Sequence, residues 1–208
     1  MYAPAHKCRP SAKAISLDFP SSGTSVMENI PKDNTGRHLI VETETRTRTR
    51  TVRESQSEYY EVCLPNDVNT LGTMLGGHVM HLVDLCGAIA AIRHAQCPVV
   101  TASVDQMTFL HPIHIGELVK LKSQVNRVFR TSMEVGVKVW VENLQTGHER
   151  HTSSAYLTFV ALDRAGNRVV LPPVVPETEE EERRFAEAAE RRAYRLAFKD
   201  KTKNQKER

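Results

Sequence analysis

The chain has 208 residues, and its 28 Lys and Arg residues against 25 Asp and Glu residues give a formal net charge of +3 at pH 7. This small excess is spread along the chain, which argues against a nucleic-acid-binding protein, because such proteins gather basic residues on one surface. No apolar run reaches the roughly 20 residues that a membrane helix needs, so we expect neither nucleic acid nor a membrane as partner.

Residues 1–53 lack a sustained apolar period and are rich in Pro, Ser, Thr and Lys, a composition typical of disorder. We expect a disordered extension over 1–53, a folded domain over 54–170 and a C-terminal helical extension over 171–208. The alternating Thr and Arg residues from Thr45 to Thr51 suggest either a basic arm for nucleic acid or anionic lipid, or an extended solvated segment. We favour the second reading, since weakly charged runs usually stay solvated.

The N-terminus offers little evidence of targeting. Residues 1–14 contain basic side chains but no apolar segment after them, so a secretory signal is not expected. A mitochondrial-type leader stays open, because the stretch is rich in Ser and poor in acidic residues, although it lacks an amphipathic arginine helix. Both Met1 and Met27 are compatible with the true start.

A first strand is expected over 58–64, followed by a helix that opens at Gly76 and Gly77. Almost every residue from Val79 to Ile92 is apolar, and a helix that is apolar all round is buried on every side. It is too short, and too interrupted by polar residues, to span a bilayer. Something must therefore wrap around it, and a single carboxylate, Asp84, lies within it two turns from its start.

The segments after this helix are predicted to form the strands that cover it. Alternation of apolar and polar side chains indicates half-buried strands over 98–109, 118–128, 133–141 and 152–161, with a turn at 144–148. Together with the first strand, they predict an antiparallel sheet of five or so strands wrapped around one long buried helix. A strand, a helix and then consecutive strands is the order of an α+β fold.

The C-terminal region changes composition after Pro172-Pro173. Acidic residues fill 177–182 and basic residues follow from Arg191 onward, an order that complements the dipole of a helix. Because its apolar stripe is thin, we expect a surface helix packed lightly on the core or on a neighbouring subunit, with frayed last residues.

The four cysteines, Cys8, Cys63, Cys86 and Cys97, show no spacing typical of a zinc site or a redox motif. Cys63 and Cys86 fall in a strand and in the buried helix, where cysteine acts as a small apolar side chain. A reducing cytoplasm fits this pattern best.

The region from about Tyr59 to Asp163 resembles the hotdog-fold acyl-CoA thioesterases, specifically the group of the brain-type cytosolic acyl-CoA hydrolase and its small bacterial relatives. The matching segments are PNDVN (65–69), GTMLGGHVMHLVD (72–84), RH (93–94), VVTASVDQMTFLHPIHIGE (99–117), RTSMEVGVKV (130–139), TGHER (146–150) and AYLTFVALD (155–163). Many ordered matches over half of the chain are more specific than any single glycine motif.

This resemblance implies hydrolysis of fatty acyl-CoA to free fatty acid and CoA, without a metal or another cofactor. It also implies a homodimer as the minimal active unit, a hexamer built as a trimer of dimers, and active sites in the dimer interface. In this group a motif asparagine, matching Asn69, faces the aspartate matching Asp84 across that interface.

Thioester hydrolysis needs a group that polarises the carbonyl and a source of the nucleophile. The helix N-terminus at Gly76 and Gly77 offers backbone N–H groups for the first task. Asp84 suits the second, as general base or as direct nucleophile, unless it is a carboxylate held by a hydrogen bond or salt bridge. Seven residues of helix span roughly 10 Å, so Gly77 and Asp84 scarcely meet at one carbonyl within one subunit.

The other candidate residues each have an alternative. Asn69 either orients the water or the carbonyl, or hydrogen-bonds its own loop, as Asn often does. The turn formed by Arg130, Thr131 and Ser132 offers a guanidinium, hydroxyl groups and backbone N–H groups for the phosphates of CoA.

Two rival readings use the same features. A metal site is one reading, with His78, His81 and Asp84, or His111 and His114, as ligands. A compact metal cluster on a helix favours ligands at i and i+4, which this spacing does not provide, so we expect no metal site. A non-catalytic acyl-CoA-binding hotdog regulator is the second function. Asp84, Asn69 and the lack of a helix-turn-helix before the first strand favour the enzyme.

Overall fold

The structure is a computed structural model that describes the backbone of residues 48–105 and 107–206 and the side chains as far as Phe198. The interpretations that concern Cys8, Met27 and Thr45 therefore lie outside the described residues. In the described part of the chain, no helix combines the length and the apolar character needed to cross a membrane.

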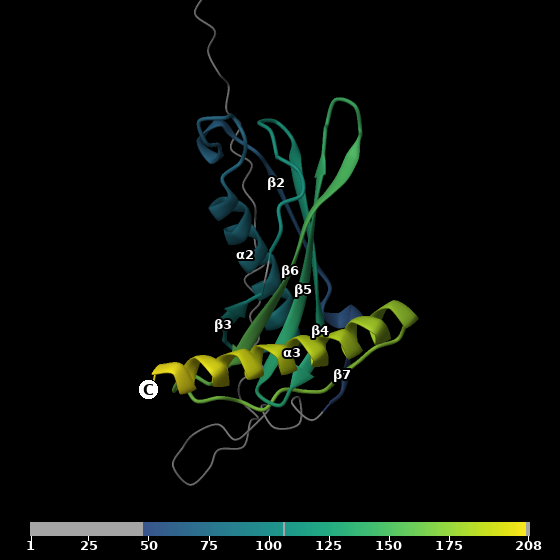
Figure 1. Ribbon diagram of the computed structural model, residues 1–208. Coiled ribbons are helices and arrows are strands. Elements are labelled where there is room, and N and C mark those ends of the chain that lie inside the picture. The colour runs from purple at the N-terminus through teal and green to yellow at the C-terminus, as the bar shows by residue number, and fades with distance from the viewer. Residues whose placement is uncertain (1–47, 106, 207–208) are drawn as a thin grey trace, which may run out of the picture. The chain divides into compact units, whose positions relative to one another are not determined.

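Five strands form one antiparallel sheet in the order β2-β4-β5-β6-β3 (Figure 1). They are β2 (Ser57–Val62), β3 (Val99–Val104), β4 (Leu118–Phe129), β5 (Ser132–Glu142) and β6 (Glu149–Ala161). The apolar positions predicted for β5 all lie in the core, as do the alternate residues of β4 and β6. The predicted α+β class and the antiparallel sheet of about five strands are confirmed.

The long helix α2 (Gly76–Ala95) begins at the predicted glycine and connects β2 to β3, which lie at opposite edges of the sheet. It therefore crosses one face, called here the inner face. Gly87 permits a close approach, because a Cβ at this position would lie 3.2 Å from the ring of Phe159. The hydroxyl group of Ser123 on β4 donates a hydrogen bond of 2.7 Å to the carbonyl oxygen of Cys86.

One side of α2 is not covered by the described chain. Met80, Leu85 and Ile92 are 48%, 38% and 49% exposed, so the expectation of burial on every side is wrong for a single chain. The physical reason is that a curved sheet covers a helix from one side only. The opposite side keeps its apolar residues in contact with solvent.

The cysteine interpretation agrees with the structure. Cys63 and Cys86 are fully buried, and burial raises the pKa of both thiols. No disulfide joins Cys63, Cys86 and Cys97 to one another.

Order begins earlier than expected. Strand β1 (Arg50–Thr51) pairs in parallel with β7 (Val174–Val175), and Val52 after it is buried in the core. The short 3₁₀ helix η1 (Arg53–Ser55) follows, and the buried hydroxyl of Ser55 accepts a hydrogen bond from the backbone N–H of Val125 at 2.9 Å. Residues 50–53 thus do not belong to a disordered extension, because their partners come from distant parts of the chain.

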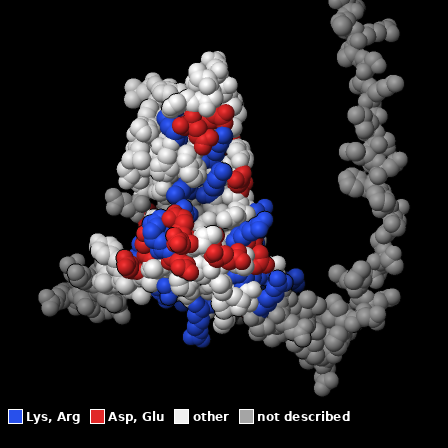
Figure 2. Space-filling view, turned by 90° about the vertical axis from the view of Figure 1, so that its right-hand side faces the viewer, with Lys and Arg blue, Asp and Glu red and all other residues white. Residues whose placement is uncertain are grey.

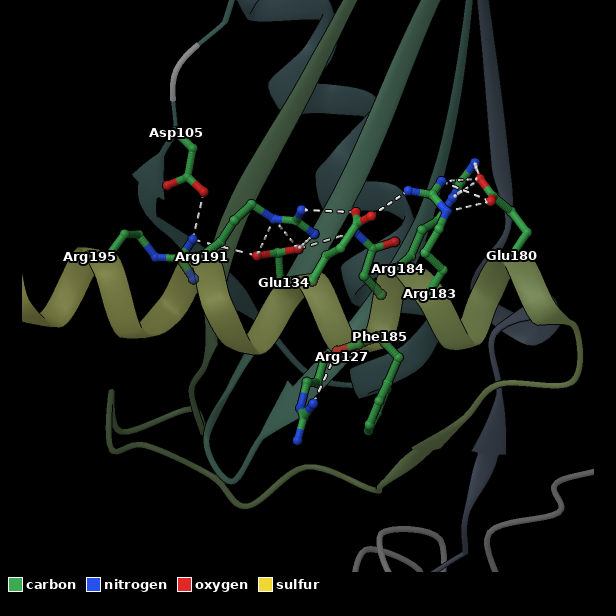
Figure 3. A network of polar contacts seen from close by, with 11 residues as sticks. Asp105, Arg127, Glu134, Glu180, Arg183, Arg184, Phe185, Arg191 and Arg195 are labelled. Carbon is green, nitrogen blue, oxygen red and sulfur yellow. Dashed lines mark hydrogen bonds and ion pairs between the residues drawn. The ribbon is translucent and has the colours of Figure 1, made fainter.

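The C-terminal helix α3 (Glu179–Lys206) crosses the outer face of the sheet and makes a polar network with it (Figures 1 and 3). Glu134, on the outer face of β5, is completely buried beneath the helix. Its carboxylate accepts a hydrogen bond from Arg191 at 2.8 Å and one from the side-chain amide of Asn126 at 3.2 Å. Arg195 lies 3.5 Å from the same carboxylate and 2.6 Å from that of Asp105.

The expectation of a lightly packed helix was therefore wrong. The guanidinium of Arg191 also lies 3.7 Å from the centre of the Tyr156 ring, and Arg127 donates to the carbonyl oxygen of Phe185 at 3.0 Å. The helix extends to Lys206, and the last two residues of the chain, where fraying was expected, lie outside the described residues. Its contact with the sheet is carried by charge and aromatic rings, which a search for an apolar stripe does not detect.

The substitution Glu134→Gln tests this network. It keeps the shape of the side chain but leaves Arg191 and Arg195 without their buried counter-charge. We expect the free energy of unfolding to fall by about 2–4 kcal/mol, measured by urea denaturation at pH 7. Glu180→Gln is the control, because its ion pairs with Arg183 and Arg184 lie at the surface and should matter little. Equal effects of the two substitutions would contradict the proposed importance of the buried pair.

Candidate active site

The N-terminus of α2 has no capping side chain. The preceding residue, Leu75, makes no side-chain cap, and the helical hydrogen bonds begin with the backbone N–H groups of His78 and Val79. Within the described residues, the N–H groups of Gly76 and Gly77 donate to no protein acceptor. A Cβ at Gly77 would meet open space. This end of the helix can therefore bind a carbonyl oxygen that becomes negative.

A cavity of about 330 Å³ lies beside this helix end. Most of its wall is apolar, and the residues that contribute include Met74, Gly76, Val79, Phe109, Leu110 and Ile113. The ring of Phe109 would lie 3.5 Å from a Cβ at Gly76, so the glycine and the aromatic ring face each other. The cavity is large enough for a short acyl chain or part of a pantetheine arm.

Asp84 is half-buried rather than enclosed, and it faces β3. Its Oδ1 accepts a hydrogen bond of 2.7 Å from the hydroxyl group of Thr101. Within the described residues no cation forms an ion pair with it. The carboxylate thus keeps one oxygen for other partners. No hydrogen bond joins Asp84 to Asn69 or to the glycines of the helix N-terminus within this chain.

Asn69 lies in the loop between η2 (Pro65–Asp67) and α2, and its side chain bonds within this loop. Its Oδ1 accepts hydrogen bonds from the backbone N–H groups of Leu71 and Thr73, at 2.8 and 3.3 Å, and its Nδ2 donates to the hydroxyl of Thr73 at 3.0 Å. In a single chain, Asn69 therefore fulfils the local role that the sequence left open as the alternative to a catalytic one.

The histidines do not form the metal cluster considered from the sequence. His78 instead groups with Glu61 and Asp67, the one such cluster among the residues whose side chains the structure describes. Its Nε2 lies 2.7 Å from Oε1 of Glu61, the distance of a direct hydrogen bond. The other oxygen of Glu61 accepts from the hydroxyl of Tyr59 at 3.0 Å. This chain of contacts ties the start of α2 to β2.

The turn with Arg130, Thr131 and Ser132 joins β4 to β5 at the end of the sheet away from Gly76. Arg130 is exposed and has a left-handed backbone, with φ of 55°. The hydroxyl of Ser132 donates to the carbonyl oxygen of Phe129 at 3.4 Å. One chain alone therefore does not bring this turn and the helix N-terminus together.

The loop that lines the cavity is fastened by a buried ion pair. Arg150 on β6 donates two hydrogen bonds to the carboxylate of Glu117, at 2.8 and 2.7 Å, and a third to the carbonyl oxygen of Pro112 at 2.9 Å. Glu117 also accepts from the backbone N–H of His114 at 2.8 Å. The pair holds residues 112–117 in place beside the helix N-terminus.

Comparison with known proteins agrees with this geometry. Residues 71–148 match the thioesterase superfamily. An uncharacterised acyl-CoA thioester hydrolase of Bacillus subtilis is 47% identical over 117 residues, which are 56% of this chain and 68% of that protein. The chain belongs to the thioesterase superfamily. Mouse acyl-coenzyme A thioesterase 11 is 40% identical over 69% of this chain, but this alignment spans only 24% of that longer protein.

Solved structures of acyl-CoA thioesterases have the same fold. A Staphylococcus aureus acyl-CoA hydrolase, solved with butyryl-CoA and CoA, has a TM-score of 0.72 and 33% identity, covering 77% of this chain and 98% of that one. A hexameric acyl-CoA thioesterase gives a TM-score of 0.70 and 38% identity, over 72% of this chain and 96% of that one. The expected hotdog fold is thereby confirmed.

Sequence reasoning about this thioesterase missed three residues near the site. Thr101 lies on a predicted strand, and correct phasing of its alternation would have placed it on the inner face beside the helix. Glu117 and Arg150 fell inside segments that resemble the family, but their spacing gives no sign of a pair, since 33 residues separate them.

The substitution Glu117→Gln tests the fastened loop through its pH dependence. Burial alone would raise the pKa of Glu117, but hydrogen bonds from Arg150 and from the N–H of His114 lower it below the usual value near 4.3. A lowered pKa stabilises the folded state above that value, and the contribution is lost as the pH falls through the lowered pKa. Wild type should exceed Glu117→Gln by about 1–3 kcal/mol in unfolding free energy at pH 7, and by much less at pH 3.

Urea denaturation at both pH values measures this difference. Glu149→Gln serves as the control, because Glu149 lies nearby on β6 and is half exposed. If the difference in unfolding free energy between wild type and Glu117→Gln stays constant from pH 7 to pH 3, the ionised pair does not have the proposed role.

Proposed function

We propose that this protein hydrolyses fatty acyl-CoA to free fatty acid and CoA. The observation that carries the proposal is the uncapped start of α2, whose two glycine N–H groups lie beside an apolar cavity of about 330 Å³. A thioester carbonyl bound there would develop its negative charge against preorganised donors, which is the largest single contribution in many acyl-transfer enzymes. The names of its relatives support the same chemistry.

Asp84 would supply the nucleophile, either by taking a proton from water or by attacking the carbonyl itself. Thr101 would position it, because the hydroxyl donates to one carboxylate oxygen and leaves the other for water or substrate. Variants of the S. aureus hydrolase replace an asparagine, an aspartate and a threonine at its positions 28, 43 and 60 with alanine. Asn69, Asp84 and Thr101 have the same separations of 15 and 17 residues.

The complete site would need two chains, because about two helical turns separate Gly77 from Asp84. The edge strand β3 has a free edge in the described chain and carries Thr101, and α2 exposes Met80, Leu85 and Ile92. Antiparallel pairing of β3 with its copy in a second chain would cover this side of the helix. Asn69 and the Arg130–Ser132 turn would then come from the other subunit, the turn binding phosphates of CoA. A trimer of such dimers is consistent with the hexameric relative.

A non-catalytic acyl-CoA-binding regulator is the alternative. The carboxylate of Asp84, held by Thr101 and free of a neutralising cation among the described residues, favours the enzyme. We place the protein in the cytoplasm, where its three described thiols stay reduced.

Asp84→Asn should leave the fold intact and lower turnover of acyl-CoA at least ~100-fold, since the base or nucleophile is lost. Thr101→Val should lower turnover about tenfold, because only a positioning hydrogen bond is lost. Thr101→Ser, which keeps the hydroxyl group, should retain most of the wild-type turnover. Steady-state hydrolysis with a thiol-detecting reagent measures each rate, and circular dichroism checks the fold. Near-normal turnover by Asp84→Asn would rule out this mechanism and favour the binding module.

The two-chain site is tested by mixing inactive Asn69→Ala protein with inactive Asp84→Ala protein under conditions where subunits exchange. Half of the dimers then contain both variants, and each has one doubly damaged site and one intact site. Activity should return to roughly a quarter of the wild-type value. Exchange can be followed by native mass spectrometry. Full exchange without recovered activity would mean that Asn69 and Asp84 do not act across an interface.

A further inference from the structure

A second cavity, of about 320 Å³, lies on the outer face of the sheet, and its wall has no residue in common with the cavity beside Gly76. Its floor is β4, β5 and β6, and one wall comes from Arg184 on α3. Gly136 in the middle of β5 leaves the hollow open. A Cβ at this position would lie 2.8 Å from the side-chain amide of Asn126, which turns over the glycine to reach Glu134.

Charges around this cavity are unbalanced. Basic and acidic side chains lie intermixed on the side of the molecule shown in Figure 2. Two cations at the cavity form ion pairs. Lys122 lies 3.2 Å from Glu58, and Arg184 lies 2.8 Å from Glu180 (Figure 3 shows the second pair). Three cations line the cavity, including Lys138, but Glu58 is its only lining carboxylate in the described part of the chain.

Lys138 is the cation at this cavity that forms no ion pair within the described residues. Among the described residues, no carboxylate or other acceptor is in hydrogen-bond or ion-pair contact with its ammonium group. Burial lowers the pKa of Lys138, and the guanidinium of Arg184 lowers it further, while the carboxylate of Glu180 acts in the opposite direction. A partly buried ammonium beside a guanidinium is stabilised by an anion in the same space.

The remaining wall suits an organic group. Trp140 on β5 and Tyr156 on β6 both line the cavity, as does Ser154, two residues before Tyr156 on β6. The indole of Trp140 contacts the ring of His151 edge-on at 5.6 Å, and His151 Nε2 is hydrogen-bonded to Ser154 at 3.0 Å. Two aromatic side chains beside a cluster of cations can bind a molecule that is apolar or flat at one end and anionic at the other.

We propose that this outer-face cavity binds a small phosphate monoester, with the phosphate at Lys138 and Arg184 and the organic part against Trp140. Once Glu58 is counted against Lys122 and Glu180 against Arg184, one unpaired cation remains, at Lys138. A phosphate monoester carries about −1.5 to −2 charges at pH 7, and its three acceptor oxygens can contact Lys138 and Arg184 together. Ligand pockets span about 300–1,000 Å³, so this volume fits a ligand with a single ring. The site lies on the face opposite α2 and does not depend on the proposed hydrolysis.

Trp140 is the only tryptophan of the chain, so its fluorescence reports on this cavity alone. The protein is titrated with phenyl phosphate, with inorganic phosphate and with phenol. Phenyl phosphate should change the fluorescence saturably, inorganic phosphate should compete with it more weakly, and phenol should have no effect in the same concentration range. Absence of a saturable change with phenyl phosphate overturns the proposal.

Two substitutions locate the anion. Lys138→Gln should weaken phenyl phosphate binding at least about tenfold, the scale of a lost charge-assisted hydrogen bond. Arg130→Gln is the matched control, because it removes an exposed cation from the turn proposed to contact CoA, and it should leave binding unchanged. If Lys138→Gln does not fold by circular dichroism, Arg184→Gln decides in its place. Binding that resists the cavity substitution, or that is lost in Arg130→Gln, overturns the site.

Discussion

The packing of α2 on the inner face of the sheet is the contact on which the rest of this structure depends. It is close because Gly87 has no side chain where the ring of Phe159 passes, and it is fixed lengthwise by the hydrogen bond from Ser123 to the backbone of Cys86. Once the helix is fixed along its axis, its uncapped start at Gly76 and Gly77 lies at one end, where Gly76 lines the cavity. Asp84 is set against β3 further along.

Two carboxylates illustrate how burial divides structural from reactive roles. Glu134 is completely buried and is surrounded by Arg191, Arg195 and the amide of Asn126. Both of its oxygens accept hydrogen bonds from arginine side chains, so this carboxylate holds α3 on the sheet. Asp84 is half-buried and has one hydroxyl partner. A carboxylate with one unoccupied oxygen is a candidate for catalysis, whereas a carboxylate neutralised by arginines has a structural role.

Much of this fold could be predicted from local patterns. Alternation placed the buried valines of β5 correctly, and the glycine pair marked the first residue of α2. Alternation also put Glu134 on the opposite face from those valines, which is correct, but it could not say what covers that face. The covering arginines lie on α3, 57 and 61 residues further along, and no local signal connects them. The same holds for the Glu117–Arg150 pair. Periodicity predicts the direction of a side chain, and only tertiary contacts determine its partner.

The parallel pairing of β1 with β7 has a consequence for the order in which the chain folds during synthesis. Arg50 and Thr51 leave the ribosome before every strand of the main sheet, yet their partners Val174 and Val175 follow the last of those strands. This pairing cannot form before residues 174–175 are synthesised, so the contacts beside the buried Val52 are complete only after the whole main sheet has been made. The strand synthesised before all the others in the described part of the chain is thus paired last, in a two-stranded sheet separate from the main one.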